Sequence, residues 1–381
     1  MDTEKLRDLR KRLHESPERS FNEVHTSEII MDFFKSVSKG KESFFKVFRP
    51  FLTSIVIEYR NGGDKPFKLF RADMDALVVT EDPAHEIVSK NEGIMHACGH
   101  DIHMTVLCGL LAFTAENLPE KNIIFVFQPG EEGAGGARKM IESGVFDGYE
   151  IESAHALHVS DDFEVGEIAS NDNVLFAIPR EVDLEFFGKS GHAAFPERGH
   201  DALAAAADFL CTIEHVIHKN LNPTNIFHAH FGKLTSGSAR NVTSDYSKIE
   251  GTLRSFSSET MQEGTELVRQ TAEKCAGSYG CTSKLTVLGE YIEVENSPNL
   301  FRKLQKIAEK NGIRCIYKKG DLVGEDFGYF TKRWSGIIFW LGTRRPGAEP
   351  QPLHSNKFFP SFEAVDTALK IMIGMLMDNI E

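Results

Sequence analysis

The run from Asn122 to Gln128 constrains the fold most, because almost every residue in it is apolar. Such a run is typical of a strand buried on both faces of a sheet that helices cover. It ends in Pro129-Gly130-Glu131-Glu132-Gly133, and a helix is expected to begin near Gly135. Acidic side chains therefore lie where a strand ends and a helix begins, which is the edge where open α/β sheets form their sites.

Helix and strand patterns alternate on both sides of this run. Helical periodicity covers residues 3–15, 22–36 and 104–116, and strands are expected over 54–59 and 67–72. From about Phe176 the pattern changes to a β-α-β-β-α-β order, which is typical of a compact α+β unit. Because 381 residues are many for one hydrophobic core, we expect an α/β domain in two parts, 1–176 and 289–381, interrupted by an inserted domain at 177–288.

The composition excludes some classes of partner. The formal net charge of −13 argues against nucleic acid, because phosphate binding needs a basic surface. The six cysteines show no paired framework, which suits a reducing cytoplasm. No apolar stretch approaches the roughly 20 residues of a membrane span, and no signal peptide is expected from the charged first residues. We therefore expect a soluble cytoplasmic protein.

The stretch 95–103 concentrates side chains that bind metals, with three imidazoles, a thiol and a carboxylate within nine residues. A thiolate and a neutral imidazole are good ligands for a divalent cation such as zinc. Cys98 and His100 are two residues apart, so in an extended segment they would face the same way, and Gly99 allows backbone angles that a bulkier residue would resist. The alternative is a histidine-rich loop without a metal, and the spacing alone does not decide between them.

Three further features offer candidate site residues. Asp73 and Asp75 follow an expected strand and lie on one side of an extended chain. The side chains of the adjacent Glu131 and Glu132 point in different directions, so one would bind a metal while the other faces the attacking water. The alternative is a solvated helix N-terminus, where the helix dipole favours acidic side chains. His158 lies in an apolar, strand-like run, where a single histidine is more often a core residue than a ligand.

Five motifs occur in one order along the chain: His96-Ala97-Cys98-Gly99-His100-Asp101, Gln128-Pro129-Gly130-Glu131-Glu132-Gly133, Ser190-Gly191-His192-Ala193-Ala194, Gly324-Glu325-Asp326-Phe327 and Leu353-His354-Ser355. Together they resemble the dinuclear-metal amidohydrolases of the aminoacylase and carboxypeptidase superfamily, over nearly the whole chain. The branch they resemble hydrolyses N-acyl amino acids, and its bacterial N-acetyldiaminopimelate deacetylases are the most similar group. The resemblance implies a metallopeptidase-like α/β catalytic domain, with a mixed sheet flanked by helices and an inserted ferredoxin-like α+β lid or dimerisation domain.

The resemblance also implies a role for each site residue. Two divalent ions, zinc first with manganese, cobalt or nickel as alternatives, would be held by Cys98, His100, Glu132, His158 and His354. Glu131 would be the general base, and Asp75 would orient a ligand. His192 would reach the oxyanion, in relatives often from a partner subunit. Asn241 and Arg254 would bind the substrate, with Arg254 suited to pair with a carboxylate.

The implied activity is removal of the acetyl group from N-acetyl-LL-diaminopimelate, which gives acetate and LL-diaminopimelate in lysine biosynthesis. An aminoacylase for another acyl group or amino acid would use the same residues. Two other classes remain open, a binding module that keeps the fold without catalysis and a hydrolase with Cys98 as nucleophile. The only implied partners are the small-molecule substrate and a second copy of the chain, bound through the inserted domain.

Overall fold

The computed structural model describes residues 2–133, 135–289 and 291–378. These residues divide into two compact units. The first contains the chain up to Leu175, then Val294–Lys319, and then the chain from Asp326 onward. The second contains Phe176–Glu293 and the short segment Gly320–Glu325. The expected insertion at 177–288 lies inside the second unit, whereas the sequence pattern assigns segment 320–325 to the catalytic domain.

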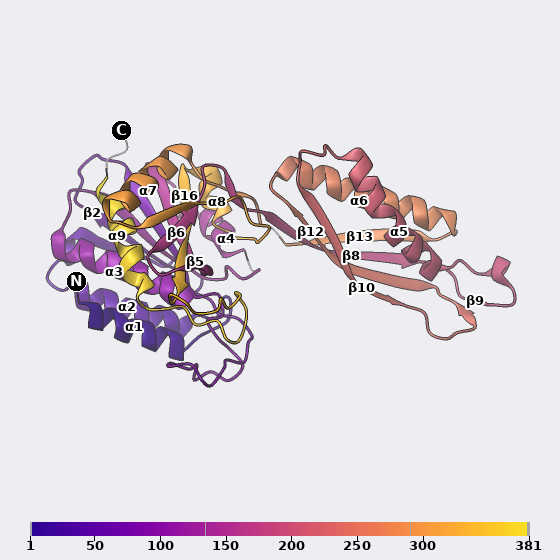
Figure 1. Cartoon of the computed structure of the whole chain (residues 1–381), viewed down its shortest axis with the longest axis horizontal. Helices are drawn as coiled ribbons and strands as arrows, with labels where there is room; N and C mark the ends of the chain where they lie inside the picture. Colours follow the sequence, from indigo (N-terminus) through magenta and orange to yellow (C-terminus); the bar gives the residue numbers. More distant parts are fainter. Residues whose placement is uncertain (1, 134, 290, 379–381) are drawn as a thin grey trace. The chain divides into compact units, whose positions relative to one another are not determined.

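Within the described residues, the first unit is built on an eight-stranded mixed sheet (Figure 1). Its central strands run parallel, from β4 through β3 and β5 to β16. Strand β2 pairs antiparallel with β4 on one side, and β6 pairs antiparallel with β16 on the other. In spatial order the strands are β1 (Phe45–Phe48), β2 (Ile55–Arg60), β4 (Asn122–Gln128), β3 (Phe67–Asp73), β5 (Ile151–Glu164), β16 (Gly336–Arg344), β6 (Glu167–Ser170) and β15 (Arg314–Tyr317).

Strand β4 shows why this sheet forms. All seven of its residues are buried, as the sequence predicted. Ile123, Phe125 and Phe127 join the core beneath the long helix α3 (His100–Asn117), while the alternating Ile124 and Val126 are fully buried as well. Since both faces of the strand are covered, the expected α/β class with helices flanking a mixed sheet is confirmed.

The helices of the first unit pack around α3. Helices α1, α2 and α9 all contact it, while α4 packs against α8 and α7 packs against α9. Helix α3 begins at His100, four residues before the expected start at Met104, so the predicted boundary was wrong. The other helices of this unit are α1 (Thr3–Glu15), α2 (Val24–Ser38), the 3₁₀ turn Glu42–Phe44, α4 (Gly136–Glu142), α7 (Pro298–Lys310), α8 (Gly328–Arg333) and α9 (Ala364–Met377).

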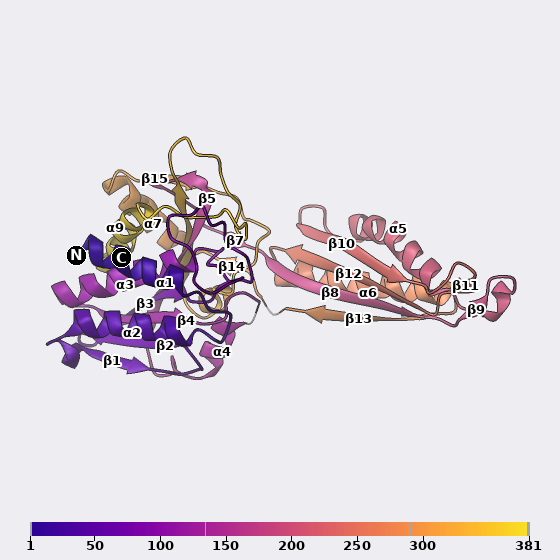
Figure 2. The ribbon, with the colours of Figure 1, turned by 90° about the horizontal axis from the view of Figure 1, so that it is seen from below.

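The second unit is a four-stranded antiparallel sheet with two helices packed on it (Figure 2). The strand order β10-β12-β8-β13, with one helix after β8 and one after β12, is the β-α-β-β-α-β arrangement expected from the sequence. Its own core contains Phe186, Phe209 and Leu253. The elements are β8 (Ile178–Phe187), α5 (Ala202–Asn220), β10 (Phe227–Ser236), β12 (Tyr246–Ser255), α6 (Ser258–Ser278) and β13 (Thr282–Leu288).

Two short ladders complete the structure. Strands β7 (Val174–Phe176) and β14 (Val294–Glu295) pair with each other, as do β9 (Gly191–His192) and β11 (Val242–Thr243), with the 3₁₀ turn Pro196–Arg198 after β9. Among the described residues, no helix combines the length and the apolar character that crossing a bilayer requires.

Candidate metal centre

The five expected metal ligands come together at one edge of the large sheet. Their donor atoms form two overlapping groups, Cys98–His100–His158 and Cys98–Glu132–His354, and within each group the atoms lie within 4.8 Å of one another. Glu131 joins a third group with His100 and Glu132. Glu132 follows β4, His158 lies on β5 and His354 precedes α9. Cys98 and His100 lie at the start of α3. The chain therefore brings four distant segments to the carboxyl ends of parallel strands.

Gly99 shapes the segment that carries Cys98 and His100. It has a φ of +73°, the left-handed region that glycine adopts at little cost. An added Cβ would lie 2.4 Å from Cγ2 of Val159, so no other residue fits here without displacement. The two donors therefore converge through a left-handed turn at the start of α3, and the expected extended segment was wrong.

His100 is oriented by Asp75. Its Nδ1 donates to the backbone oxygen of Asp75 at 2.8 Å, and a carboxylate oxygen of Asp75 lies 3.4 Å from the same nitrogen. The opposite Nε2 is buried without a hydrogen-bond partner, 3.9 Å from Oε1 of Glu132. Burial alone would lower the pKa of His100, but the carboxylates of Asp73 and Asp75 outweigh burial and raise the pKa to about 10.

His158 faces Cys98. Its Nδ1 donates to the carbonyl of Val159 at 2.9 Å, and its Nε2 lies 3.4 Å from the Cys98 sulfur. Burial and the nearby His103 hold the pKa of His158 well below its usual value, which favours the neutral imidazole that binds metals. Burial and the Glu132 carboxylate raise the pKa of the Cys98 thiol well above its usual value. A thiol with a raised pKa forms little of the nucleophilic thiolate at neutral pH, which argues against the cysteine-hydrolase alternative.

The turn after β4 positions both glutamates. The carboxylate of Asp75 accepts the backbone N–H of Glu131 at 3.1 Å and that of Glu132 at 3.0 Å, and also accepts the hydroxyl of Ser20. Oε1 of Glu132 is buried without a hydrogen-bond partner. Burial raises the pKa of Glu132 to about 7, against the opposing effect of His100. Asp75 therefore holds the backbone of both acids as well as one imidazole.

His354 closes the cluster from the loop before α9. Its backbone N–H donates to the carbonyl of Ala97 at 2.9 Å, which ties this loop to the segment of Cys98. The φ of His354 is +64°, a strained value for a residue with a side chain. Its Nε2 lies 3.7 Å from Oε1 of Glu132. The strain is consistent with a backbone held in place so that the imidazole faces the cluster.

The donor set fits a divalent cation. Buried polar atoms are normally hydrogen-bonded, and each exception costs about 1–3 kcal/mol. Here Nε2 of His100 and Oε1 of Glu132 are two such exceptions, and they face each other. One sulfur, three imidazoles and a carboxylate are a donor set that borderline cations prefer.

The second unit carries the other three expected residues. His192 and Asn241 are neighbours, because His192 pairs with Val242 and the N–H of Ala193 donates to the carbonyl of Asn241 at 3.0 Å. Arg254 pairs with Pro179 at the other end of the small sheet, and its guanidinium donates to the carbonyl of Leu322 at 2.6 Å. The intervening stretch of β12, from Tyr246 to Arg254, spans about 26 Å in an extended strand. One copy of the chain therefore does not bring Arg254 together with His192 and Asn241.

Comparison with known proteins shows which protein family the chain belongs to. The model of peptidase family M20/M25/M40 matches residues 69–378. The chain belongs to this family. An N-acetyldiaminopimelate deacetylase of Shouchella clausii is 33% identical over 369 residues, which cover 97% of this chain and 96% of that protein. A deacetylase of the same name from Streptococcus sanguinis is 36% identical over 374 residues, which cover 97% of each chain.

A solved structure agrees with this placement. A Bacillus subtilis protein described as a dinuclear metal binding peptidase of the M20 family has a TM-score of 0.84 at 26% identity, and the match covers 98% of this chain and 97% of that chain. Family membership and this match confirm the superfamily resemblance inferred from the sequence motifs. They also confirm the mixed α/β architecture.

A network of buried charged groups, to which the sequence assigned no catalytic role, lies beside the candidate ligand His100. Arg71 donates to Asp73 at 2.6 Å and to Asp326 at 2.8 Å, and all three side chains are buried. Asp73 in turn accepts from Nδ1 of His103 at 2.6 Å, and Nε2 of His103 accepts the N–H of Val159 at 3.0 Å. The signal for Arg71 was weak, because Lys68 and Asp73 are charged residues of the same strand.

A second charge network includes Asp101, the residue after the candidate ligand His100. His14 is fully buried between two carboxylates, with Nδ1 2.9 Å from Asp101 and Nε2 2.7 Å from Glu81. Burial alone would lower the pKa of His14, but Asp101 and Glu81 outweigh burial and raise the pKa to about 9. His14 is therefore positively charged at neutral pH and links α1 to α3.

This network predicts a pH-dependent stability. Because the pKa of His14 rises from about 6.5 unfolded to about 9 folded, its contribution is complete below pH 6.5 and is lost as the pH rises through 9. The shift corresponds to about 3 kcal/mol of the free energy of unfolding. Urea unfolding at pH 6.5 and pH 9 should show a loss of stability in the unmodified protein that is smaller by about this amount in His14→Gln, because His100 still titrates in both proteins. The exposed His25→Gln variant should show the same change in the free energy of unfolding as the unmodified protein. A change of equal size in all three proteins would contradict the prediction.

Proposed function

We propose that this chain is a metal-dependent deacetylase that hydrolyses N-acetyl-LL-diaminopimelate to acetate and LL-diaminopimelate, a step of lysine biosynthesis. The observation that carries the substrate is the similarity, over almost the whole chain, to proteins named N-acetyldiaminopimelate deacetylase. The cluster of buried ligand candidates supports the chemistry. All six cysteines are unpaired in the structure, which is consistent with a cytoplasmic enzyme.

The five clustered donors are proposed to hold two divalent ions, with zinc as the first choice because of the Cys98 sulfur. When bound, the ions supply Lewis acidity toward the amide carbonyl and positive charge beside the developing oxyanion. Nε2 of His100 and Oε1 of Glu132, which have no hydrogen-bond partner, are the strongest individual candidates.

Glu131 is the proposed general base. It is 5% exposed, and an oxygen of its carboxylate lies 3.4 Å from the backbone N–H of Asp326. Because Asp75 holds the backbone of both glutamates, the two neighbouring carboxylates can take separate roles. Glu132 faces His100 and His354. Glu131 would accept a proton from the attacking water and then donate it to the leaving amine.

Removing divalent ions should abolish deacetylation, and adding Zn²⁺ back should restore it. Because an ion that binds only the folded protein stabilises it, the melting temperature should also rise on addition of Zn²⁺. Acetate release, elemental analysis and a thermal melt of chelator-treated protein check both expectations. Full activity in protein shown to be metal-free would contradict the proposed metal centre.

The substrate is tested with a panel of amides. Purified enzyme should release acetate from N-acetyl-LL-diaminopimelate with a higher kcat/KM than it shows on N-acetylmethionine or hippurate. A preference for either of the last two would assign the chain to an aminoacylase of different specificity, while leaving the metal chemistry in place. Absence of hydrolysis of all three by zinc-loaded protein would exclude the deacetylase proposal.

We also propose that the enzyme acts as a homodimer through its second unit. His192 and Asn241 lie together at one end of the small sheet and Arg254 at the other. If all three contact one small substrate, the His192–Asn241 end and the Arg254 end must come from different copies. Strand β10 is an open edge of this sheet, where another strand or chain can add.

Mixing two inactive variants tests whether His192 acts across the dimer. In a mixed dimer of Glu131→Gln and His192→Ala chains, one site regains both an intact base and a partner histidine. Random exchange in a two-fold dimer should then restore about a quarter of the unmodified activity. No recovery, despite subunit exchange shown by mass spectrometry, would place His192 in its own subunit or outside the reaction.

A further inference from the structure

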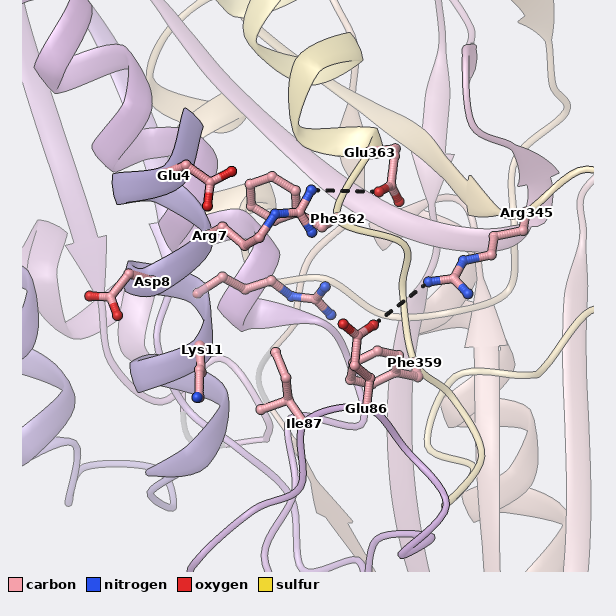
Figure 3. A pocket seen from close by; sticks show the side chains of 11 residues that line it. Glu4, Arg7, Asp8, Lys11, Glu86, Ile87, Arg345, Phe359, Phe362 and Glu363 are labelled. Carbon is pink, nitrogen blue, oxygen red and sulfur yellow. Dashed lines mark ion pairs between the residues drawn. The ribbon is translucent and has the colours of Figure 1, made fainter. Parts of the chain in front are cut away.

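A cavity of about 460 Å³ lies in the first unit, between α1, the segment around Glu86 and the chain that leads from β16 into α9 (Figure 3). None of its lining residues belongs to the candidate metal centre. Its walls combine charged side chains with the apolar Ile87, Phe359 and Phe362. The cavity is therefore a separate place where a small molecule could bind.

The charges around this cavity are balanced. Four cationic side chains line it: Arg7, Arg10, Lys11 and Arg345. Four carboxylates line it as well: Glu4, Asp8, Glu86 and Glu363. A multiply charged anion such as phosphate would meet as much repulsion as attraction, because the lining has no net charge. A zwitterion can place each of its charges beside an opposite one, so the lining favours a zwitterionic ligand.

Two long ion pairs join side chains that line the cavity, and dashed lines mark them in Figure 3. Arg7 lies 3.7 Å from Glu363, and Arg345 lies 4.0 Å from Glu86. The Arg345 and Glu86 side chains are 66% and 74% exposed. Long, exposed pairs of this kind stabilise a protein by little, about 0–1 kcal/mol. A ligand with its own carboxylate and ammonium group can replace such a pair at little cost in stability.

Arg10 supplies the observation that points to a ligand. The residue is only 3% exposed, and its Nε donates to Asp101 at 3.0 Å while the guanidinium lies 4.8 Å from the ring centre of Phe359. Its Nη2 is buried without a hydrogen-bond partner. A buried guanidinium nitrogen left unpaired is costly, and a carboxylate oxygen is the acceptor that suits it best.

We infer that this cavity binds a free α-amino acid with an apolar side chain. The ligand carboxylate would lie between Arg10 and Arg345, the ammonium group against Glu86, and the side chain against Ile87. The inference does not rest on the proposed substrate, because no lining residue takes part in the proposed reaction. Since Arg10 also holds Asp101, the residue after the candidate ligand His100, an occupied cavity would contact a side chain that anchors the start of α3.

Binding is best measured by calorimetry on the full-length protein after treatment with a chelator. The chelator removes metal ions, so that an amino acid cannot bind to a metal at the candidate metal centre instead of in the cavity. L-leucine is the probe. Two analogues each lack one of its charges, 4-methylpentanoate without the ammonium group and 3-methylbutylamine without the carboxylate. Losing one charged contact should weaken binding about tenfold or more for each analogue. Arg345→Gln should weaken the binding of L-leucine at least about threefold.

Arg314→Gln is the matched control, because Arg314 also forms an exposed ion pair, with Glu167 at 2.8 Å, but does not line the cavity. It should bind L-leucine as tightly as the unmodified protein does. Three results would overturn the inference: no binding of L-leucine to the metal-free protein, equal binding of 4-methylpentanoate, or equal affinities of the Arg345→Gln and Arg314→Gln variants.

Discussion

Replacing Glu131 by glutamine should lower kcat about a thousandfold and leave the bound metal in place. General acid–base catalysis by a positioned side chain contributes roughly 10²–10⁴-fold to a rate, and an amide neither accepts nor returns the proton. The substitution keeps the size and shape of the side chain. The backbone N–H of residue 131 would still donate to Asp75. Steady-state acetate release and elemental analysis of the same preparation measure the two quantities.

Replacing the neighbouring Glu132 should have a different effect on bound metal than replacing Glu131. Glu132→Gln should lose activity by losing metal, because Glu132 faces His100 and His354. Glu142→Gln, an exposed residue of α4 paired with Arg138, should change neither quantity. Unchanged turnover in Glu131→Gln would exclude this residue as the base, and loss of metal there would give it the role proposed for Glu132.

The sequence predicted the parts of this protein that depend on local pattern. The run at β4 indicated a strand buried on both faces, since no polar face interrupts Ile123–Phe127. That pattern alone was enough to place the two carboxylates after the run at a strand end. Spacing alone left His158 and His354 ambiguous, and only the resemblance to the amidohydrolase superfamily linked them to Cys98. The structure brings these three side chains into one cluster.

Other features depend on contacts between distant segments and left no local pattern. Gln128 and Asp326 are 198 positions apart, yet the amide of Gln128 donates to both carboxylate oxygens of Asp326 at 2.9 Å. Helix α3 begins directly after Gly99, which has a left-handed backbone and lies too close to Val159 for a side chain. Alternation along β8 and β12 identified strands, but only the register shows that Arg254 lies at the opposite end of the sheet from His192.

The Asp326 network should also dominate the stability of the catalytic unit. This carboxylate is 1% exposed and accepts from Arg71, from Gln128 and from the backbone N–H of Ala137. Asp326→Ala would therefore remove an acceptor from three buried donors. It would also remove one of the carboxylates that balance the buried charge of Arg71. Removing one partner of a buried charged pair costs about 3–5 kcal/mol, so the free energy of unfolding should fall by about that amount.

Asp366→Ala is the matched control, because Asp366 pairs with Lys370 one turn along α9 and is 70% exposed. An exposed pair of this spacing contributes less than about 1 kcal/mol, although the atoms removed are the same. Urea unfolding of both variants and of the unmodified protein, all stripped of metal, gives the difference directly. If the two variants were equally stable, the buried network would not hold the β3 and β4 strand ends in place. In that case the position of the Glu131–Glu132 turn would depend on Asp75 and Ser20 instead.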